Sequence, residues 1–426
     1  MNDAFPEPIF AAFVAFDWAD QEHAGALTLT HGGKVEAFSL KQTPEAIDEW
    51  AAALRTRCGG QPVAVALEQS KGALIYALLK YEFLVLYPIN PKQLARFREV
   101  LGSSGAKDDP TDASLLLELL LKHREHLRPW RPDDATTRLL GQLAEDRRAL
   151  IADRTQLTNR LKSRLKQYFP LALEVLGELD TELAARFLLR WNSLEELQRE
   201  DPQEVAAFYR VMHCHHPHLI EERLKKIAQA VPLVNDSAII ASGKRLVEAV
   251  AAQLLALVEP LKQYELQISA LMAQHSDAKI FQSFPGAGDA LAPRLLTAFG
   301  TDRARIETAD QMQCLSGIAP VTVRSGKSCH VHRRWACNKY LRQTFHEFAL
   351  HSLPRSVWAK AYYDMLRARG SHHHAAVRAL AFKWIRILHR CWKTRTLYNE
   401  ILYLQQLQKK NSPILKFIAE NSRKSK

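Results

Sequence analysis

Two apolar runs near the start of the chain each end in a carboxylate, and this feature constrains the fold more than any other. Asp17 follows the run FAAFVAF, and Glu68 follows PVAVAL. Short, continuous apolar runs of this kind predict buried strands. Both carboxylates should therefore emerge at the carboxyl end of a sheet, where ligand sites form.

The segments around these runs predict an ordered series of elements. Extended segments at 24–30 and 34–40 flank the turn 31–33, which indicates a hairpin. The pattern then predicts a helix at 44–57, the strand before Glu68, a helix at 72–81, a strand at 83–89 and a helix from Pro91. Three antiparallel strands followed by alternating helix and strand is the order of the ribonuclease H fold, in which the first and fourth strands present acidic residues side by side.

A second pair of carboxylates precedes an apolar helical run. Asp109 and Asp112 stand three residues apart, before the run SLLLELLL, and so share one face of the first helical turn. An Asp at a strand end can be only a turn residue, and an Asp before a helix can be only an N-cap. Four such groups on one sheet rim would repel one another unless a cation lies between them, and hard oxygen ligands suit Mg²⁺ or Mn²⁺.

Composition favours a protein that handles polyanions. The net charge is +12, and from residue 324 to the end Arg and Lys alternate with Trp, Tyr, Phe and His. This mixture offers phosphate contacts and stacking surfaces, although a basic tail can also be merely solvated surface. The six cysteines form no CxxC pair, which argues against a zinc ribbon or a disulfide framework and favours a reducing cytoplasm. No apolar run predicts a membrane span or a signal peptide.

The middle of the chain predicts long helices. Leucines recur at four- and seven-residue steps between Leu139 and Leu165, which predicts a helix that ends at Pro170. A second apolar stripe over 242–274 predicts another long helix, with a kink at Pro260. Two long helices flanking a helical insert would suit subunit contacts or the bracing of an extended nucleic acid. The stripes could equally be ordinary core.

The last third contains a turn and a serine that bear on chemistry. The segment FPGAGDALAPRLLTAFG (284–300) predicts a helix-hairpin-helix in which the amides of Gly286 and Gly288 approach a phosphate. Ser325, in an expected loop beside Arg324, could attack phosphorus or only bind a phosphate, whereas Ser328 is expected to face elsewhere. The tripeptide GKS at 326–328 is no P-loop, because Val321 stands where the first glycine is required. The histidine-rich segments 213–218 and 371–374 are interpreted as surface, not as metal sites.

These motifs, in this order, resemble the DEDD transposases of the RNA-guided insertion-sequence family, which includes the pilin-gene invertases. The matching motifs are the two acidic strand ends, K-x-D-x-x-D-A, F-P-G-x-G, G-I-A-P, and R-S-G-K-S before a basic helix with N-K-Y-L-R, and the resemblance covers nearly the whole chain. It implies a RuvC-like, ribonuclease H-fold catalytic domain at 1–130 and a helical coiled-coil region for oligomerisation and RNA binding at 131–278. It further implies a helical transposase domain at 279–410 and a basic tail at 411–426.

The resemblance also implies chemistry and partners. The positions that match the family's metal-binding and catalytic carboxylates are Asp17, Glu68, Asp109 and Asp112, and the position that matches its catalytic serine is Ser325. Implied partners are donor and target DNA, a bridge or seeker guide RNA, and further copies of the chain in a dimer or tetramer, so that the acidic domain of one subunit can meet the serine of another. The implied location is the bacterial cytoplasm, on the nucleoid when bound to DNA. The residues expected to contact nucleic acid are Lys107, Gly286, Gly288, Arg324, Lys327, Arg333, Arg334, Lys339 and Arg342.

The sequence departs from the family pattern in two places. Asp108 adds a carboxylate beside Asp109, and the spacing to Asp112 favours Asp109 as the ligand; the stretch 171–242 is longer than a minimal spacer. Two alternatives remain open: a junction resolvase or metal-dependent nuclease in which water attacks, and a nucleic-acid-binding scaffold without catalysis. The scaffold is disfavoured because a binding surface gains nothing from carboxylates that repel one another.

Overall fold

The computed structural model describes residues 9–30, 33–68, 72–101, 109–326 and 328–424. The chain forms two compact units, Met1–Pro132 and Asp133–Lys426, and each is described by itself. The divisions expected at 278 and 410 fall inside the second unit and stay predictions.

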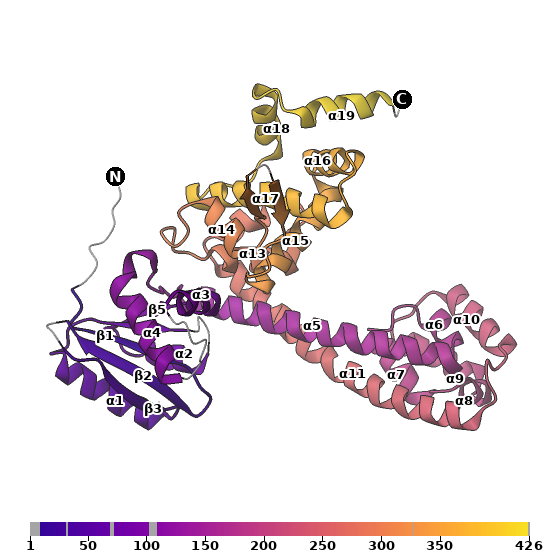
Figure 1. The fold of residues 1–426 in the computed structure, drawn as a ribbon. Coiled ribbons are helices and arrows are strands. Elements are labelled where there is room, and N and C mark those ends of the chain that lie inside the picture. Colours follow the sequence, from indigo (N-terminus) through magenta and orange to yellow (C-terminus); the bar gives the residue numbers. More distant parts are fainter. Residues whose placement is uncertain (1–8, 31–32, 69–71, 102–108, 327, 425–426) are drawn as a thin grey trace. The chain divides into compact units, whose positions relative to one another are not determined.

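The first unit is built on a five-stranded mixed sheet (Figure 1). The strand order is β3-β2-β1-β4-β5. Strand β2 is antiparallel to both β1 and β3, whereas β1, β4 and β5 run parallel to one another. The predicted succession of strands and helices is confirmed, although the second helix is shorter than expected and part of the turn at 31–33 lies outside the described residues. The strands are β1 (Ala12–Asp17), β2 (Glu22–Leu29), β3 (Glu36–Lys41), β4 (Val63–Leu67) and β5 (Leu84–Pro88). The helices are α1 (Pro44–Arg57), α2 (Ala73–Leu78), α3 (Pro91–Leu101), α4 (Asp109–Lys122) and the 3₁₀ turn η1 (Arg124–His126).

Strands β1 and β4 are apolar throughout because both of their faces are covered. Alternate residues point to opposite faces of a strand. On one face Val14 and Phe16 pack with side chains of α1 and α2, and on the other Phe13 and Ala15 pack with side chains of α4. The central strands therefore hold their carboxyl ends in a fixed position between two cores.

The second unit begins with two long helices that lie side by side, α5 (Ala135–Tyr168) and α11 (Ser237–Gln274), as Figure 1 shows. Helix α5 ends two residues before Pro170, and α11 continues through Pro260 without interruption. At their far ends Leu161 and Leu165 enter a core formed with the insert, whereas Leu139 is 48% exposed. Part of the leucine stripe is thus core of this chain, and its role between subunits stays a prediction. The insert consists of α6 (Leu171–Leu176), α7 (Glu182–Arg190), α8 (Leu194–Arg199), α9 (Pro202–Val211) and α10 (Pro217–Gln229).

The remainder of the second unit is mainly helical and packs around a core of its own. Its centre contains three fully buried tryptophans, Trp358, Trp384 and Trp392. The first elements are α12 (Ala278–Gln282), α13 (Gly288–Phe299), α14 (Ala309–Leu315), β6 (Val321–Ser325), β7 (Ser328–His332) and α15 (Lys339–Ser352). They are followed by η2 (Leu353–Arg355), α16 (Val357–Ala368), α17 (His373–Thr394), α18 (Glu400–Lys409) and α19 (Pro413–Lys424). In the described parts of the chain, no helix is both long enough and apolar enough to cross a membrane.

Candidate active site and nucleic-acid interface

Two of the predicted carboxylates lie side by side at the carboxyl edge of the sheet. Asp17 is the last residue of β1, and Glu68 directly follows β4. The parallel register pairs Phe16 with Leu67, so Asp17 and Glu68 occupy the next position on adjacent strands. Asp17 is 7% exposed and Glu68 is half-buried. The sheet therefore brings these two groups together, as the sequence predicts.

Helix α4 brings a third carboxylate to the same sheet. It packs against β1, β2 and β4, and Asp112 in its first turn is 1% exposed. The guanidinium of Arg98, from α3, donates to Asp112 Oδ1 through Nε at 3.0 Å and also through Nη2. Helix α4 begins at Asp109, but the side chain of that residue and all of Lys107 lie outside the described residues.

The donor chemistry fits a hard divalent cation, with one condition. Carboxylate oxygens are the ligands that Mg²⁺ and Mn²⁺ prefer, and buried carboxylates need a positive partner. Arg98 is that partner for Asp112 and donates only to Oδ1, so a cation would bind through Oδ2 or displace the guanidinium from Oδ1. Among the side chains that the structure describes, which exclude Asp109, no three His, Cys, Asp or Glu are grouped to hold an ion.

Removal of Arg98 should destabilise the protein and make its stability depend on metal. In Arg98→Met, Asp112 is left buried and unpaired, which typically costs about 3–5 kcal/mol. If Asp112 is a metal ligand, Mg²⁺ should restore part of this loss, and urea unfolding with and without Mg²⁺ measures both effects. The matched control is Arg57→Met, which breaks the exposed ion pair with Glu36 and should change stability little. A stability loss that Mg²⁺ leaves unchanged would contradict the metal role of Asp112.

A buried histidine beside the site was not identified from the sequence. His23, on β2, is 0% exposed; its Nδ1 accepts from the Ala19 N–H at 3.2 Å, and its Nε2 lies 2.6 Å from Gln42 Oε1. Nε2 therefore carries the proton and donates to Gln42, while burial lowers the pKa of the imidazole. This arrangement fixes the turn that follows Asp17. The sequence signal is a histidine within an otherwise apolar strand.

The structure corrects two expectations about Ser325. The residue does not lie in a loop but ends β6, in an exposed hairpin whose ladder pairs Ser325 with Ser328 across the turn at Gly326 (φ 57°). Directly paired residues project from the same face of a two-stranded ribbon. Ser328 thus shares the face of Ser325 instead of facing elsewhere, and Arg324, one residue away, belongs to the opposite face.

A histidine lies on the same face and contacts Ser328. His330 pairs with Val323, two residues from Ser325, and its Nε2 lies 2.8 Å from Ser328 Oγ. A separation of 2.6–3.2 Å between a hydroxyl and a possible base is typical of an activated nucleophile. His330 could not be identified from the sequence, because its contact with Ser328 depends on the hairpin register.

Near the hairpin, arginines gather without carboxylate partners. Burial lowers the pKa of the Arg378 guanidinium, and the nearby charges of Arg333 and Arg342 lower it further. Arg333 also lies over the ring of Trp335, 4.9 Å from its centroid, and that ring is 71% exposed. In the part of the chain that the structure describes, none of six neighbouring cations forms an ion pair: Arg324, Arg333, Arg334, Lys339, Arg342 and Arg378. Unneutralised cations beside an exposed aromatic ring are typical of a surface that binds nucleic acid.

Histidines of α15 and α17 border this basic surface. The rings of His346 and His374 lie 5.5 Å apart, and those of His373 and His374 lie 4.9 Å apart. Burial lowers the pKa of His346 to about 4, with further contributions from His374 and Arg378. His346 is therefore neutral at physiological pH and adds no positive charge to this surface.

The predicted Pro-Gly-x-Gly turn is present, but its first glycine serves packing. Gly286 has φ 83°, and a side chain there would collide with the backbone of His351 and Ser352. These two constraints account for glycine at 286 without a ligand. Gly288 (φ 52°) begins α13 and faces open space. The predicted phosphate contacts of both glycines are untested.

Comparison with known proteins identifies the class of the chain. Residues 14–170 match the DEDD transposase model of IS110 elements, and residues 278–364 match the transposase model of the IS116/IS110/IS902 family. The chain is 29% identical to a mini-circle putative transposase for IS117 of Streptomyces coelicolor, over 92% of this chain and 97% of that protein. It is also 28% identical to an uncharacterized 42 kDa protein of insertion element IS900 from Mycobacterium paratuberculosis, over 83% and 88% of the two chains.

The matched segments include the acidic sheet edge in the first unit and the serine hairpin in the second. Together with the mixed α/β first unit and the helical second unit, they define a transposase, an enzyme of DNA strand transfer. The chain belongs to the IS110/IS116 family of insertion-sequence transposases.

Proposed function

We propose that this transposase cuts and rejoins the DNA strands of a mobile element and its target, guided by an RNA, with a divalent-metal DEDD site and a serine nucleophile. The observation that carries the proposal is the adjacency of Asp17 and Glu68 on neighbouring parallel strands, with Asp112 buried on the helix that covers them. The strand order and directions support a ribonuclease H-like, RuvC-like fold for this unit.

Asp17, Glu68, Asp109 and Asp112 would hold the cation. Mg²⁺ or Mn²⁺ bound there would polarise the scissile phosphate and stabilise the leaving oxygen. Arg98 holds the Asp112 side chain in place, and His23 holds the turn after Asp17. Both side chains position the carboxylates and do not themselves touch the substrate.

Ser325 is the proposed nucleophile. Its Oγ forms a bond to phosphorus as the bond from phosphorus to one deoxyribose oxygen breaks; the hydroxyl proton passes to a base, and the leaving oxygen takes up a proton. The covalent phosphoserine keeps the bond energy that rejoining needs. His330 is the imidazole placed to accept the proton, directly or through Ser328.

From the sequence, Arg324, Lys327 and Arg333 are expected to balance the charge of the transition state. Lys327 lies outside the described residues and Arg324 belongs to the opposite face of the hairpin, so Arg333, with Arg342 and Arg378 near it, is the proposed group.

The basic, aromatic surface of the second unit supports an RNA partner as well as DNA. In other RNA-guided systems base pairing carries the sequence information, while the protein reads backbone and shape. Assembly as a dimer or tetramer would allow the acidic unit of one copy to meet the serine of another.

Sequencing the RNA that copurifies with the protein tests the guide. We expect one non-coding RNA, transcribed from the end of the element, to dominate the copurified pool, with loops complementary to donor and target DNA. Arg333→Gln with Arg342→Gln should reduce its yield, since each removes a phosphate contact; Arg245→Gln, an exposed arginine on α11, is the control. A pool that matches total cellular RNA would argue against RNA guidance.

A further inference from the structure

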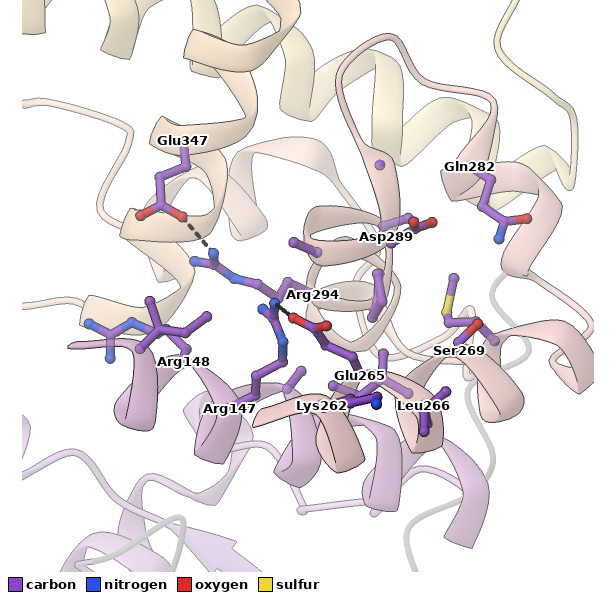
Figure 2. A pocket seen from close by; sticks show the side chains of 18 of the residues that line it. Arg147, Arg148, Lys262, Glu265, Leu266, Ser269, Gln282, Asp289, Arg294 and Glu347 are labelled. Atoms are coloured by element: carbon purple, nitrogen blue, oxygen red, sulfur yellow. Dashed lines mark hydrogen bonds and ion pairs between the residues drawn. The ribbon is translucent and has the colours of Figure 1, made fainter. Parts of the chain in front are cut away.

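A cavity of about 990 Å³ lies in the second unit, between α5, α11, α13 and α15 (Figure 2). Its volume is at the upper end of the range of ligand sites. Basic and acidic side chains line it together with apolar ones, among them Arg147, Arg148, Arg294, Glu265 and Glu347. Gly288, which the sequence predicts to approach a phosphate, also lines it, but no sequence motif assigns a role to these arginines.

Arg294 is the most buried cation of the cavity, at 8% exposed. Its Nε donates to Thr344 Oγ1 at 3.1 Å and its Nη1 to Glu347 at 2.5 Å, but Nη2 is buried and has no partner among the described residues. The guanidinium lies over the ring of Tyr340, whose pKa burial raises to about 12, so this phenol stays neutral. An unsatisfied buried donor of this kind costs about 1–3 kcal/mol, and an acceptor from a ligand would remove that cost.

Arg147 provides a second incompletely paired guanidinium. Its Nη2 donates to Glu265 at 2.5 Å, while its buried Nε has no partner within the described chain. Arg148, next on α5, donates to the neutral amide of Gln343 at 2.6 Å. Figure 2 shows Arg147 and Arg294 extending from α5 and α13 toward the same part of the cavity. The lining therefore has four basic side chains, from Arg147, Arg148, Lys262 and Arg294, and three acidic ones, from Glu265, Asp289 and Glu347.

The N-terminus of α13 is a weaker place for an anion. Its first turn faces the same cavity and lacks a side-chain cap, but Asp289 lies in that turn and would repel an anion. The surplus of positive charge lies with the arginines. Their planar, forked donors match the oxygens of a phosphate in a bidentate manner.

We infer that this cavity binds a phosphodiester of a single nucleic-acid strand, with Arg147, Arg148 and Arg294 on the phosphate oxygens. The apolar walls at Ile151, Leu266 and Met272 would cover the adjoining sugar or base, which free phosphate lacks. The identity of the ligand as nucleic acid rests on the proposed function, whereas the arginine cluster is independent of it. RNA and DNA share the phosphodiester, so the experiment distinguishes them.

Arg147→Gln and Arg148→Gln, made singly and together in the full chain, test the inference. The measurement is fluorescence anisotropy with labelled twelve-nucleotide oligo(U) and oligo(dT), as a function of salt. Each substitution should weaken binding of at least one strand about 5- to 10-fold and lower the slope of log K against log salt by about 0.7, the value for one phosphate contact of a single strand. The strand with the larger loss identifies the ligand.

Arg160→Gln, at an exposed position of α5, is the matched control and should leave the affinity and the salt slope nearly unchanged. Circular dichroism checks folding, and Arg294→Lys, which keeps the charge but loses the fork, gives a second variant at the buried position. Unchanged affinity and slope for folded Arg147 and Arg148 variants with both strands would overturn the inference. A second outcome would also overturn it: inorganic phosphate at millimolar concentration binds the wild type but not the variants, and it displaces neither oligonucleotide from the wild type.

The same experiment separates this inference from the proposed function. Asp17→Asn belongs to the other unit and should bind the oligonucleotides like the wild type. If Asp17→Asn retains strand cleavage while Arg147→Gln loses affinity, the catalytic proposal is wrong and the inference about the cavity is supported. If Asp17→Asn loses cleavage while Arg147→Gln keeps its affinity, the catalytic proposal is supported and the inference about the cavity is wrong.

Discussion

Asp17→Asn should abolish DNA strand cleavage in Mg²⁺ while leaving nucleic-acid binding nearly unchanged. Asp17 ends β1, is almost fully buried and lies next to Glu68 across the parallel pair, so its carboxylate is central to any cation site at this edge. Loss of a residue that only hydrogen-bonds to a metal ligand typically lowers metal affinity or activity about 10- to 100-fold. Loss of a ligand itself should therefore lower cleavage at least about 100-fold. Cleavage of labelled donor DNA, followed against Mg²⁺ concentration, measures the effect.

Asp20→Asn provides the matched control for this change. It removes the same charge from an exposed position three residues along the same turn, and it should retain cleavage. Asp109→Asn should behave like Asp17→Asn if the four carboxylates act as one site. Full activity of both site variants in Mg²⁺ would refute the DEDD assignment, whereas equal losses in Asp17→Asn and Asp20→Asn would indicate a general charge effect.

The position of the acidic edge could be predicted because its signal is local. A strand covered on both faces requires a continuous apolar run, and the runs before Asp17 and Glu68 end where the strands end. The long helices could be predicted for the same reason, since their apolar spacing persists over many turns.

The interactions that complete the sites could not be predicted, because they join residues from different elements. Arg98 and Asp112 are fourteen residues apart on two helices, and no local pattern indicates their ion pair. The sequence predicts a loop at Ser325 because both strands of the hairpin are exposed and show no buried, alternating face. Its register then determined which side chains share a face with the serine, and the sequence alone does not give that register.

The hairpin register leads to the final prediction, on the identity of the nucleophile. A serine nucleophile leaves protein covalently joined to DNA, whereas attack by water leaves free ends. With a suicide substrate, we expect the wild type to form an adduct that survives denaturing electrophoresis, and Ser325→Ala to reduce it at least about 10³-fold. Both serines are exposed, so either substitution should change stability little, and a loss of adduct would report chemistry.

Ser328→Ala is the matched control, because Ser328 is paired with Ser325 and presents the same hydroxyl on the same face. It should lower the rate of adduct formation only modestly, by removing the group that holds His330, and His330→Gln should lower it further if the imidazole accepts the proton. Mass spectrometry of the trapped peptide locates the phosphoserine. An adduct at Ser328 would show that Ser328, and not Ser325, is the nucleophile. Cut DNA without any adduct, in both the wild type and Ser325→Ala, would establish the hydrolytic alternative, because water would then be the attacking group at the acidic site.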